Sequence, residues 1–182
     1  MGHQLNPYIQ GTLATAANTE DYNKFLAESK RHKDFLKKTE EFNQAFGALE
    51  GTSTGDDVDL LQPVGHRFAD GLYIREWEAP PDMVTVSAIH NQSNPIFLME
   101  GDVTVLTENG ADRLSAPWYT ITAAGTQRIL YTHTKTKFIT VHRSDLLDAD
   151  SMRDELTFGH YDDVVRDYPE VEQIAKFIKH SE

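Results

Sequence analysis

The stretch that decides the fold is "IHNQSNPIFLMEG", which runs from Ile89 to Gly101. One short apolar run ends at a histidine, a polar turn follows, and a second run ends at a glycine. Runs of the same kind, rich in β-branched and aromatic residues, recur around it: "GLYIREWEAP", "MVTVSAIH", "DVTVLT", "WYTITA", "QRILYTH" and "KFITVH". Turn-forming segments such as "APPD" and "ENG" separate them. Short strands at this spacing predict a mainly β, antiparallel sandwich or barrel.

The sequence around these strands divides the chain into four zones. We expect an irregular arm over 1–18, an N-terminal helix and linker over 19–57, the β-barrel over 58–148, and an acidic C-terminal helical extension over 149–182. Phenylalanines recur at roughly helical spacing in the second zone, which predicts one apolar helix face packed on the barrel. The alternative is that the helix and the arm dock on a second copy of the chain or on another protein.

The composition narrows the classes of partner. Asp and Glu outnumber Lys and Arg by 29 to 17, so the net charge is −12. This balance argues against nucleic acids and anionic membranes, because both are bound through basic side chains. The chain has no cysteine, no apolar run of membrane-spanning length and no secretory signal pattern at its first residues. We therefore expect a cytoplasmic protein without a nucleic-acid or membrane partner.

Alternation along the strands selects the candidate site residues, because every second side chain faces the same side. In "MVTVSAIH", Val84, Val86 and His90 share a face, which we expect to be the interior. In "KFITVH", His142 shares a face with Phe138. Imidazoles that meet at one end of a barrel suit a transition metal. The alternative is that each histidine is a lone side chain, hydrogen-bonded at a strand end.

Arg128 has two possible orientations. It alternates with apolar neighbours in "QRILYTH", so its side chain could point into a partly apolar cavity. An inward arginine needs a partner and would favour a carboxylate or a phosphate. The other orientation is outward, on a solvated sheet face.

Glu76 and Glu78 also share a face, which we interpret as solvated. The sequence contains no nucleophile elbow, P-loop, dinucleotide fingerprint or HExxH motif.

Taken together, "IHNQSNPIFLMEGDVTVL", "SAPWYTITAAGTQRILYTH" and "FITVH" resemble the cupins, and the resemblance covers about residues 63–148. It implies a small antiparallel jelly-roll barrel. The segments "HRFADGLYIRE" and "EGDVTVLTENGADRLSAP" are more narrowly similar to small cupin-like proteins of tailed phages and prophages. That similarity implies a viral protein in the host cytoplasm, or a component of the virion.

The metal ligands of the cupin motifs are mostly replaced. His90 matches the first motif histidine, but Gln92 and Asn94 stand where a second histidine is expected. Ile96 or Phe97 stands in place of the motif glutamate, and Arg128 lies near the place of the last histidine. The resemblance therefore implies a metal-poor site. If a metal binds, His66, His90 and His142 are the ligands that we expect.

We therefore predict a cupin-like protein, without catalytic residues, that binds a small polar or anionic ligand in the barrel. The expected binding residues are His66, Tyr73, His90, Asn94, Arg128, Tyr131 and His142. One alternative is a structural or interaction protein, a homo-oligomer or a partner complex, that assembles through its arm and helices. The other is an enzyme with a divalent transition metal in a rearranged histidine site.

Overall fold

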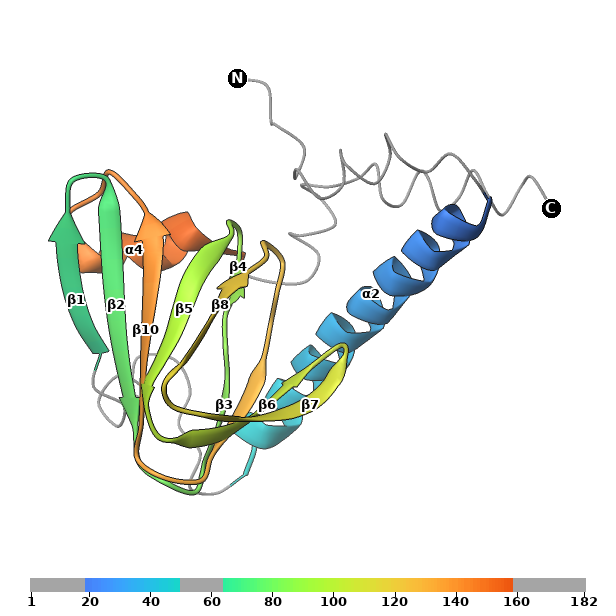
Figure 1. Ribbon diagram of the computed structural model, residues 1–182, viewed down its shortest axis with the longest axis horizontal. Helices are drawn as coiled ribbons and strands as arrows, with labels where there is room; N and C mark the ends of the chain where they lie inside the picture. The colour runs from blue at the N-terminus through green and yellow to red at the C-terminus, as the bar shows by residue number, and fades with distance from the viewer. Residues whose placement is uncertain (1–18, 50–63, 159–182) are drawn as a thin grey trace. The chain divides into compact units, whose positions relative to one another are not determined.

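A computed structural model describes residues 19–49 and 64–158 (Figure 1). The N-terminal helix is confirmed as α2, Thr19–Gly47. Leu36 and Thr39 are buried, and the rings of Phe42 and Phe46 stack with centroids 5.4 Å apart. The expected arm, most of the linker and the extension beyond 158 lie outside the described residues. No described helix is both long and apolar enough to cross a membrane.

The β region forms two antiparallel sheets and one small strand pair (Figure 1). The five-stranded sheet has the order β1-β2-β10-β5-β8, with β1 Val64–Ala69, β2 Leu72–Ala79, β10 Thr136–Arg143, β5 Asn94–Glu100 and β8 Trp118–Thr122. The four-stranded sheet has the order β3-β9-β6-β7, with β3 Met83–Val86, β9 Ile129–Thr132, β6 Asp102–Thr107 and β7 Gly110–Ser115. The pair joins β4, Ile89–His90, to β11, Thr157–Phe158. This arrangement confirms the expected mainly β, antiparallel architecture.

One apolar cluster joins the two sheets. Its buried members are Trp77, Ala79, Leu98 and Phe138 from the five-stranded sheet and Val103, Val105 and Leu130 from the four-stranded sheet. These side chains alternate with exposed or half-buried neighbours, as the period of two requires. The burial of this shared core supplies the main force that holds the sheets together.

The strand register arranges the inner face of the five-stranded sheet in levels. One level is apolar and consists of Val64, Trp77, Phe138, Leu98 and Trp118, which pair in turn across the five strands. The next level consists of His66, Arg75, Thr140, Ile96 and Thr120. At the level beyond it, Tyr73 pairs with His142 and Asn94 pairs with Thr122. The inner face therefore changes from apolar to polar along the strands.

Two features complete the β domain at its corners. Gly101, between β5 and β6, has φ +101°, and a Cβ there would lie 2.5 Å from the backbone oxygen of Lys135. Strands β6 and β7 form a hairpin, but Asn109 and Gly110 are not the central residues of a type I′ turn there. Thr107 pairs with Gly110, so the loop residues are Glu108 and Asn109, and only Gly110 of this turn has positive φ. A type I′ turn would need positive φ at both loop residues.

The first residues of the acidic extension continue the β domain. Asp148 caps helix α4, Ala149–Leu156, by accepting a hydrogen bond from the backbone N–H of Asp150. Met152 and Leu156 of this helix are buried in a second cluster with Tyr73. Strand β11 then pairs with β4, where Thr157 lies opposite His90. Residues 149–158 thus pack beside Tyr73 and His90 at the polar level of the sheet.

Candidate functional site

The candidate site is a group of interior polar side chains, which we call the polar end. Its members are Arg75, His90, Asn94, Thr122, Arg128, Thr140 and His142. The inner face of the sheet supplies His142 and Asn94, which are 3% and 1% exposed. His142 Nε2 lies 3.1 Å from Thr140 Oγ1. The other ring nitrogen, Nδ1, is buried without a hydrogen-bond partner among the residues that the structure describes.

His90 lies at the polar end, but alternation along a single strand does not explain this position. Register places Met83 opposite Thr132 and Thr85 opposite Leu130, so the inner face of β3 carries Met83 and Thr85. The expectation that Val84 and Val86 face the interior with His90 is therefore wrong. Strand β3 ends at Val86 and β4 begins at Ile89, and this interruption resets the alternation. His90 still comes to lie beside His142.

The two imidazoles form a close pair. Their ring centroids lie 5.0 Å apart in an edge-to-face arrangement. His90 Nδ1 lies 3.1 Å from Asn94 Oδ1, and Asn94 Nδ2 donates to the carbonyl of Pro95. Because Asn94 Oδ1 can only accept, His90 donates from Nδ1, and in the neutral ring Nε2 remains an acceptor.

The environment keeps both histidines neutral at physiological pH. Burial lowers the pKa of His90 to about 4, with additional lowering from its coupling to the His142 ring and from the positive charges of Arg128 and Arg75. Burial also lowers the pKa of His142 to about 4, with a further contribution from Arg75. Desolvation disfavours the charged imidazolium, and neighbouring cations act in the same direction. The polar end therefore combines neutral imidazoles with positive guanidinium groups.

Arg128 takes the inward orientation. Its Nη2 donates to Thr122 Oγ1 at 3.0 Å, and Thr122 is a buried residue of the inner face. The backbone of Arg128 is held on both sides by Ser87, which accepts from its N–H through Oγ and donates to its carbonyl oxygen. Burial lowers the pKa of Arg128, whereas the Glu108 carboxylate raises it.

His66 and Tyr73 lie at the margin of the polar end. His66 is exposed, and its Nδ1 lies 2.8 Å from the Tyr73 hydroxyl. The buried Tyr73 ring lies between two imidazoles, with its centroid 5.9 Å from that of His66 and 6.0 Å from that of His142. Tyr73 therefore separates His66 from the histidine pair.

This separation bears on the alternative of a metal site formed by His66, His90 and His142. His66, His90 and His142 do not converge on one point, and Asn94 Oδ1 lies against the Nδ1 of His90. Over 19–49 and 64–158, no group of three His, Asp or Glu side chains could hold a metal ion. The described residues thus do not fit the expected three-histidine site.

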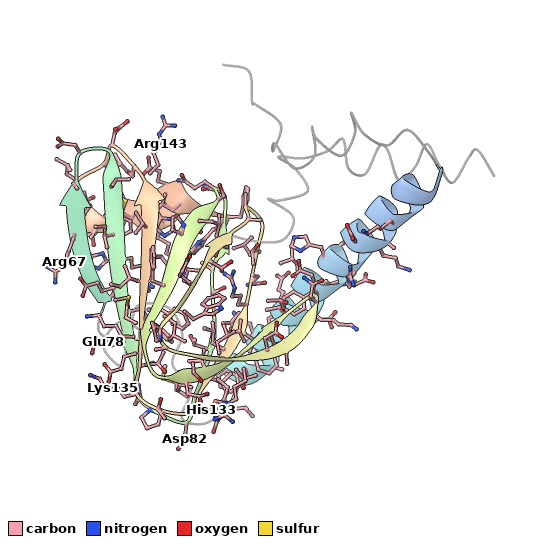
Figure 2. The ribbon with its side chains drawn as sticks, viewed as in Figure 1. Arg67, Glu78, Asp82, His133, Lys135 and Arg143 are labelled. Carbon is pink, nitrogen blue, oxygen red and sulfur yellow. The ribbon has the colours of Figure 1, made fainter. Side chains whose placement is uncertain are left out.

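Tyr131 and His133 lie away from the polar end. Leu130 and Thr132 of β9 are buried in the core, so Tyr131 faces the opposite side, where its hydroxyl donates to Asp82. Its ring packs edge-to-face on His133, with centroids 4.7 Å apart. In Figure 2, Asp82 and His133 lie at the opposite end of the β domain from Arg143, which follows His142 in the chain. Tyr131 therefore lies apart from the other predicted binding residues.

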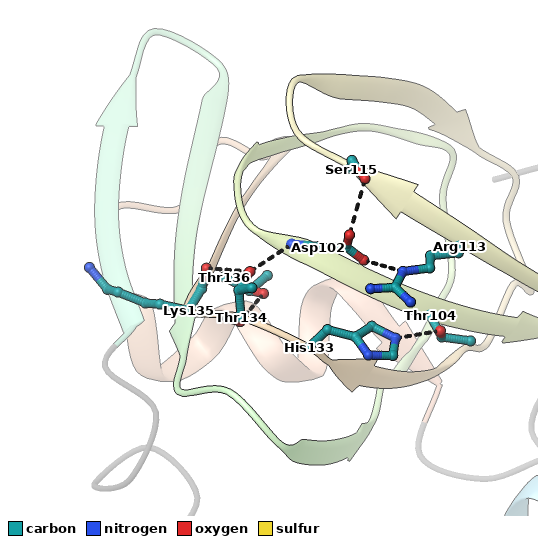
Figure 3. A network of polar contacts seen from close by, with 8 residues as sticks. All are labelled: Asp102, Thr104, Arg113, Ser115, His133, Thr134, Lys135 and Thr136. Carbon is teal, nitrogen blue, oxygen red and sulfur yellow. Dashed lines mark hydrogen bonds and ion pairs between the residues drawn. The ribbon is translucent and has the colours of Figure 1, made fainter.

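The network around His133 is part of the outer framework. His133 Nε2 lies 2.8 Å from Thr104 Oγ1 (Figure 3). Asp102 accepts hydrogen bonds from Arg113 and Ser115, and its N–H donates to Thr134 (Figure 3). These bonds tie strand β7 and the loop before β10 to the start of β6. We assign the network to the stability of this corner.

The acids Glu76 and Glu78 lie on the outer face of the five-stranded sheet, as expected. Glu76 pairs with Arg67 at 2.5 Å and with Lys137 at 2.9 Å. Lys137 and Lys135 lie 3.3 and 3.5 Å from Glu78, and Figure 2 shows Arg67, Glu78 and Lys135 at the margin of the domain. Hydrogen bonds from Arg67 and Lys137 lower the pKa of Glu76 to about 2. This is a solvated ion-pair network and not a catalytic acid pair.

Sequence reasoning missed three members or neighbours of the polar end. Arg75 could have been found by alternation, since it shares a face of β2 with Tyr73 and Trp77. Thr122 is the last residue of β8, and the sequence pattern did not show which face of that strand lies inside. Glu108 stands in a polar turn, "TENG", and nothing in that pattern relates it to Arg128. Its position follows from the β6–β9 pairing alone.

Comparison with known proteins finds similarities only among solved structures. No protein-family model and no curated protein sequence matches the chain. Among solved structures, a cupin domain from Bordetella pertussis is 16% identical over 46% of this chain and 93% of its own, with a TM-score of 0.38. The DMSP lyase DddQ from Ruegeria pomeroyi is 16% identical over 55% of each chain, with a TM-score of 0.43. Ectoine synthase from P. lautus is 13% identical over 48% of this chain and 64% of its own, with a TM-score of 0.40.

Proposed function

We propose that the chain binds a small polar or anionic ligand at the polar end, without turning it over. The observation that carries this proposal is the Nδ1 atom of His142, which is buried and has no hydrogen-bond partner among the described residues. Leaving a buried polar atom unpaired costs about 1–3 kcal/mol. A ligand that supplies the missing partner would remove this cost.

The surrounding groups offer a ligand several polar contacts. Arg128 provides guanidinium N–H donors, and the neutral His90 ring provides an acceptor at Nε2. Apolar side chains such as Ile96 adjoin them on the inner face. Ligand sites of small molecules are commonly of this kind, largely apolar with a few convergent polar groups.

Thermal shift measurements test the proposal. We would compare the parent with His142→Leu in a panel of neutral polyols, sugars, nucleosides and small acids. Binding raises stability by mass action, so a ligand should raise the parent's Tm and leave the variant's unchanged. Without ligand, His142→Leu should be about as stable as the parent at neutral pH, because it removes the unpaired Nδ1 but also the partner of Thr140 Oγ1. A panel that shifts neither protein, or shifts both equally, would contradict the proposal.

The resemblance to phage and prophage proteins extends the proposal to a biological setting. There the protein would act in the host cytoplasm and sequester a host metabolite or signalling nucleotide. Mass spectrometry of small molecules that co-purify with the parent, compared with those from His142→Leu, tests this extension. A compound enriched on the parent alone would support it, and identical small-molecule profiles would contradict it.

A second function, assembly, is favoured by a different observation. The outer face of β5 and β8 exposes Met99, Tyr119 and Ile121, of which the last two are 73% and 65% exposed. Strand β8 is also an edge of the sheet. An uncharged apolar edge is an unusual surface for a monomer, and a second copy of the chain could cover it. Light scattering of the parent and of Tyr119→Glu tests this: a dimer that the variant loses supports assembly, and a monomeric parent contradicts it.

A further inference from the structure

We infer that the ligand of the polar end is a small oxyanion, a carboxylate or a phosphate, which Arg128 binds in competition with the Glu108 carboxylate. The inference rests on the proposed binding function and specifies its ligand class. It also assigns Glu108 as the internal anion that the ligand displaces.

The position of Arg128 is fixed before any ligand arrives. Its backbone N–H donates to Ser87 Oγ at 2.9 Å, and its carbonyl oxygen accepts from the Ser87 N–H at 2.9 Å. Two hydrogen bonds on either side of one residue leave the backbone little freedom. The side chain is therefore aimed into the interior by rigid neighbours, as a preorganised binding group should be.

The guanidinium has donors to spare. It carries five N–H donors, and within the described ranges its only side-chain hydrogen bond is the one to Thr122. A planar guanidinium matches the two oxygens of a carboxylate or phosphate group, which accept parallel hydrogen bonds from it. The free donors can therefore meet two oxygens of one oxyanion.

The charge around the site has the sign that an anion needs. Arg75 and Arg128 both act on His90, and Arg75 also acts on His142. Arg75 faces inward opposite Thr140, and the imidazoles themselves are neutral at physiological pH. Among the described residues, the carboxylate of Glu108 acts on Arg128. Two guanidinium groups thus act on His90, on a chain with a net charge of −12.

Glu108 reaches this region because of the hairpin geometry. Strand β6 pairs with β9 up to Leu106 opposite Ile129, so the residues that follow Leu106 lie beside those that precede Ile129. Glu108 is the first loop residue after β6, and Arg128 immediately precedes β9. In the ligand-free protein the Glu108 carboxylate therefore offsets part of the Arg128 charge. An incoming oxyanion would take over this function.

Isosteric ligand pairs test the charge requirement. Benzoate with benzamide, and butanoate with butanamide, have nearly the same shape and differ in charge. Isothermal titration with each pair, and with inorganic phosphate, should show at least one anion binding about tenfold or more tightly than its neutral partner. Equal binding of acid and amide would overturn the oxyanion inference and leave the binding function standing. Binding of a sugar or nucleoside, with no binding of anions or amides, would likewise overturn the oxyanion inference and leave the binding function standing.

Variants with opposite expected effects test the assignment of the two charged residues. Arg128→Gln should weaken anion binding about tenfold or more, because it removes a charge-assisted contact. Glu108→Gln should strengthen it severalfold, because the competing carboxylate is gone. Asp112→Asn, an exposed acid in the same hairpin, makes the same change in net charge and should leave the affinity unchanged.

The outcomes distinguish a failure of the competition between ligand and Glu108 from a failure of ligand binding itself. If Glu108→Gln and Asp112→Asn strengthen binding alike, a general charge effect replaces the specific competition, and the inference fails. If Arg128→Gln unfolds, which circular dichroism would show, the Glu108→Gln measurement still decides. If no compound of any class binds the parent, both the inference and the proposed function fail.

Discussion

The two ends of one sheet face have opposite chemistry although they are built on the same strands. At the apolar end, Trp77, Phe138 and Leu98 pair across three strands and contact the second sheet. Two levels further along, the same strands carry Tyr73, His142 and Asn94. Helix α4 contributes Met152 and Leu156 to the packing around Tyr73.

The difference shows how the domain divides stability from recognition. The apolar end buries mostly hydrocarbon surface, so burial there stabilises the fold directly. At the polar end, burial leaves Nδ1 of His142 unpaired and keeps two imidazoles neutral. Such costs are typical of sites that await a ligand. The stability that the apolar end contributes offsets these costs of the polar end.

The largest expected effect comes from breaking the apolar end. Leu98→Ala should lower the free energy of unfolding by about 2–5 kcal/mol, because Leu98 is 0% exposed and its removal leaves a cavity in the shared core. Urea unfolding followed by circular dichroism measures the change. The control is the neighbouring Met99→Ala, since Met99 is 53% exposed on the other face. Equal losses in the two variants would show that the core does not lie where the register places it.

The polar end should make stability depend on pH. Because the pKa of His142 falls from 6.5 to about 4 on folding, the unfolded chain binds the proton first as pH decreases. Stability should therefore fall from about pH 6.5 downward, by about 1.4 kcal/mol per unit of pKa lowering and on the order of 3 kcal/mol for His142 once pH reaches 4. The pKa of His90 is also lowered to about 4, so His90 acts in the same direction.

A variant and a pH window isolate this effect. Glu76, whose pKa is lowered from 4.5 to about 2, loses its contribution only below about pH 4.5, so urea unfolding between pH 6.5 and 4.5 reports the histidines. His142→Gln should lose less stability over this window than the parent. His133→Gln, on the outer framework, controls for the loss of a histidine. Parallel pH profiles for the parent and His142→Gln would contradict a neutral buried His142.

The smallest expected effect concerns Gly101, in the turn from β5 to β6 at the boundary of the apolar end. Gly101→Ala combines positive φ with a Cβ 2.5 Å from the Lys135 oxygen, and we expect a loss of roughly 1–3 kcal/mol. Gly110→Ala also has positive φ, +116°, but no atom lies within 4 Å of the added Cβ. The difference between the two free energies of unfolding measures the steric contact alone. No difference would show that backbone conformation accounts for the whole effect.

Alternation predicted part of the site from sequence. It correctly placed Phe138 and His142 on one face, because β10 is one uninterrupted strand. It placed Val84 and Val86 on the wrong face, because the break between β3 and β4 is not visible as a proline or a glycine. His90 was therefore expected inside for a reason that does not hold.

Other expectations failed because they depend on how strands meet. Tyr131 was grouped with the interior residues, but its strand turns it outward toward Asp82. The three histidines of the hypothetical metal site lie on β1, β4 and β10, and the Tyr73 ring on β2 separates His66 from the other two. Only pairing across strands shows such an intervening side chain.

By itself, the sequence determined that this chain is mainly β, because short runs with a period of two and turn residues between them are local signals. Residue identity also determined that the chain lacks most of the metal ligands of the cupin motifs that it resembles. The tertiary structure alone decided that Arg128 points inward, that His142 is left with an unpaired nitrogen, and that Glu108 lies near Arg128. These facts depend on register and strand ends, which bring together residues that are distant in the chain.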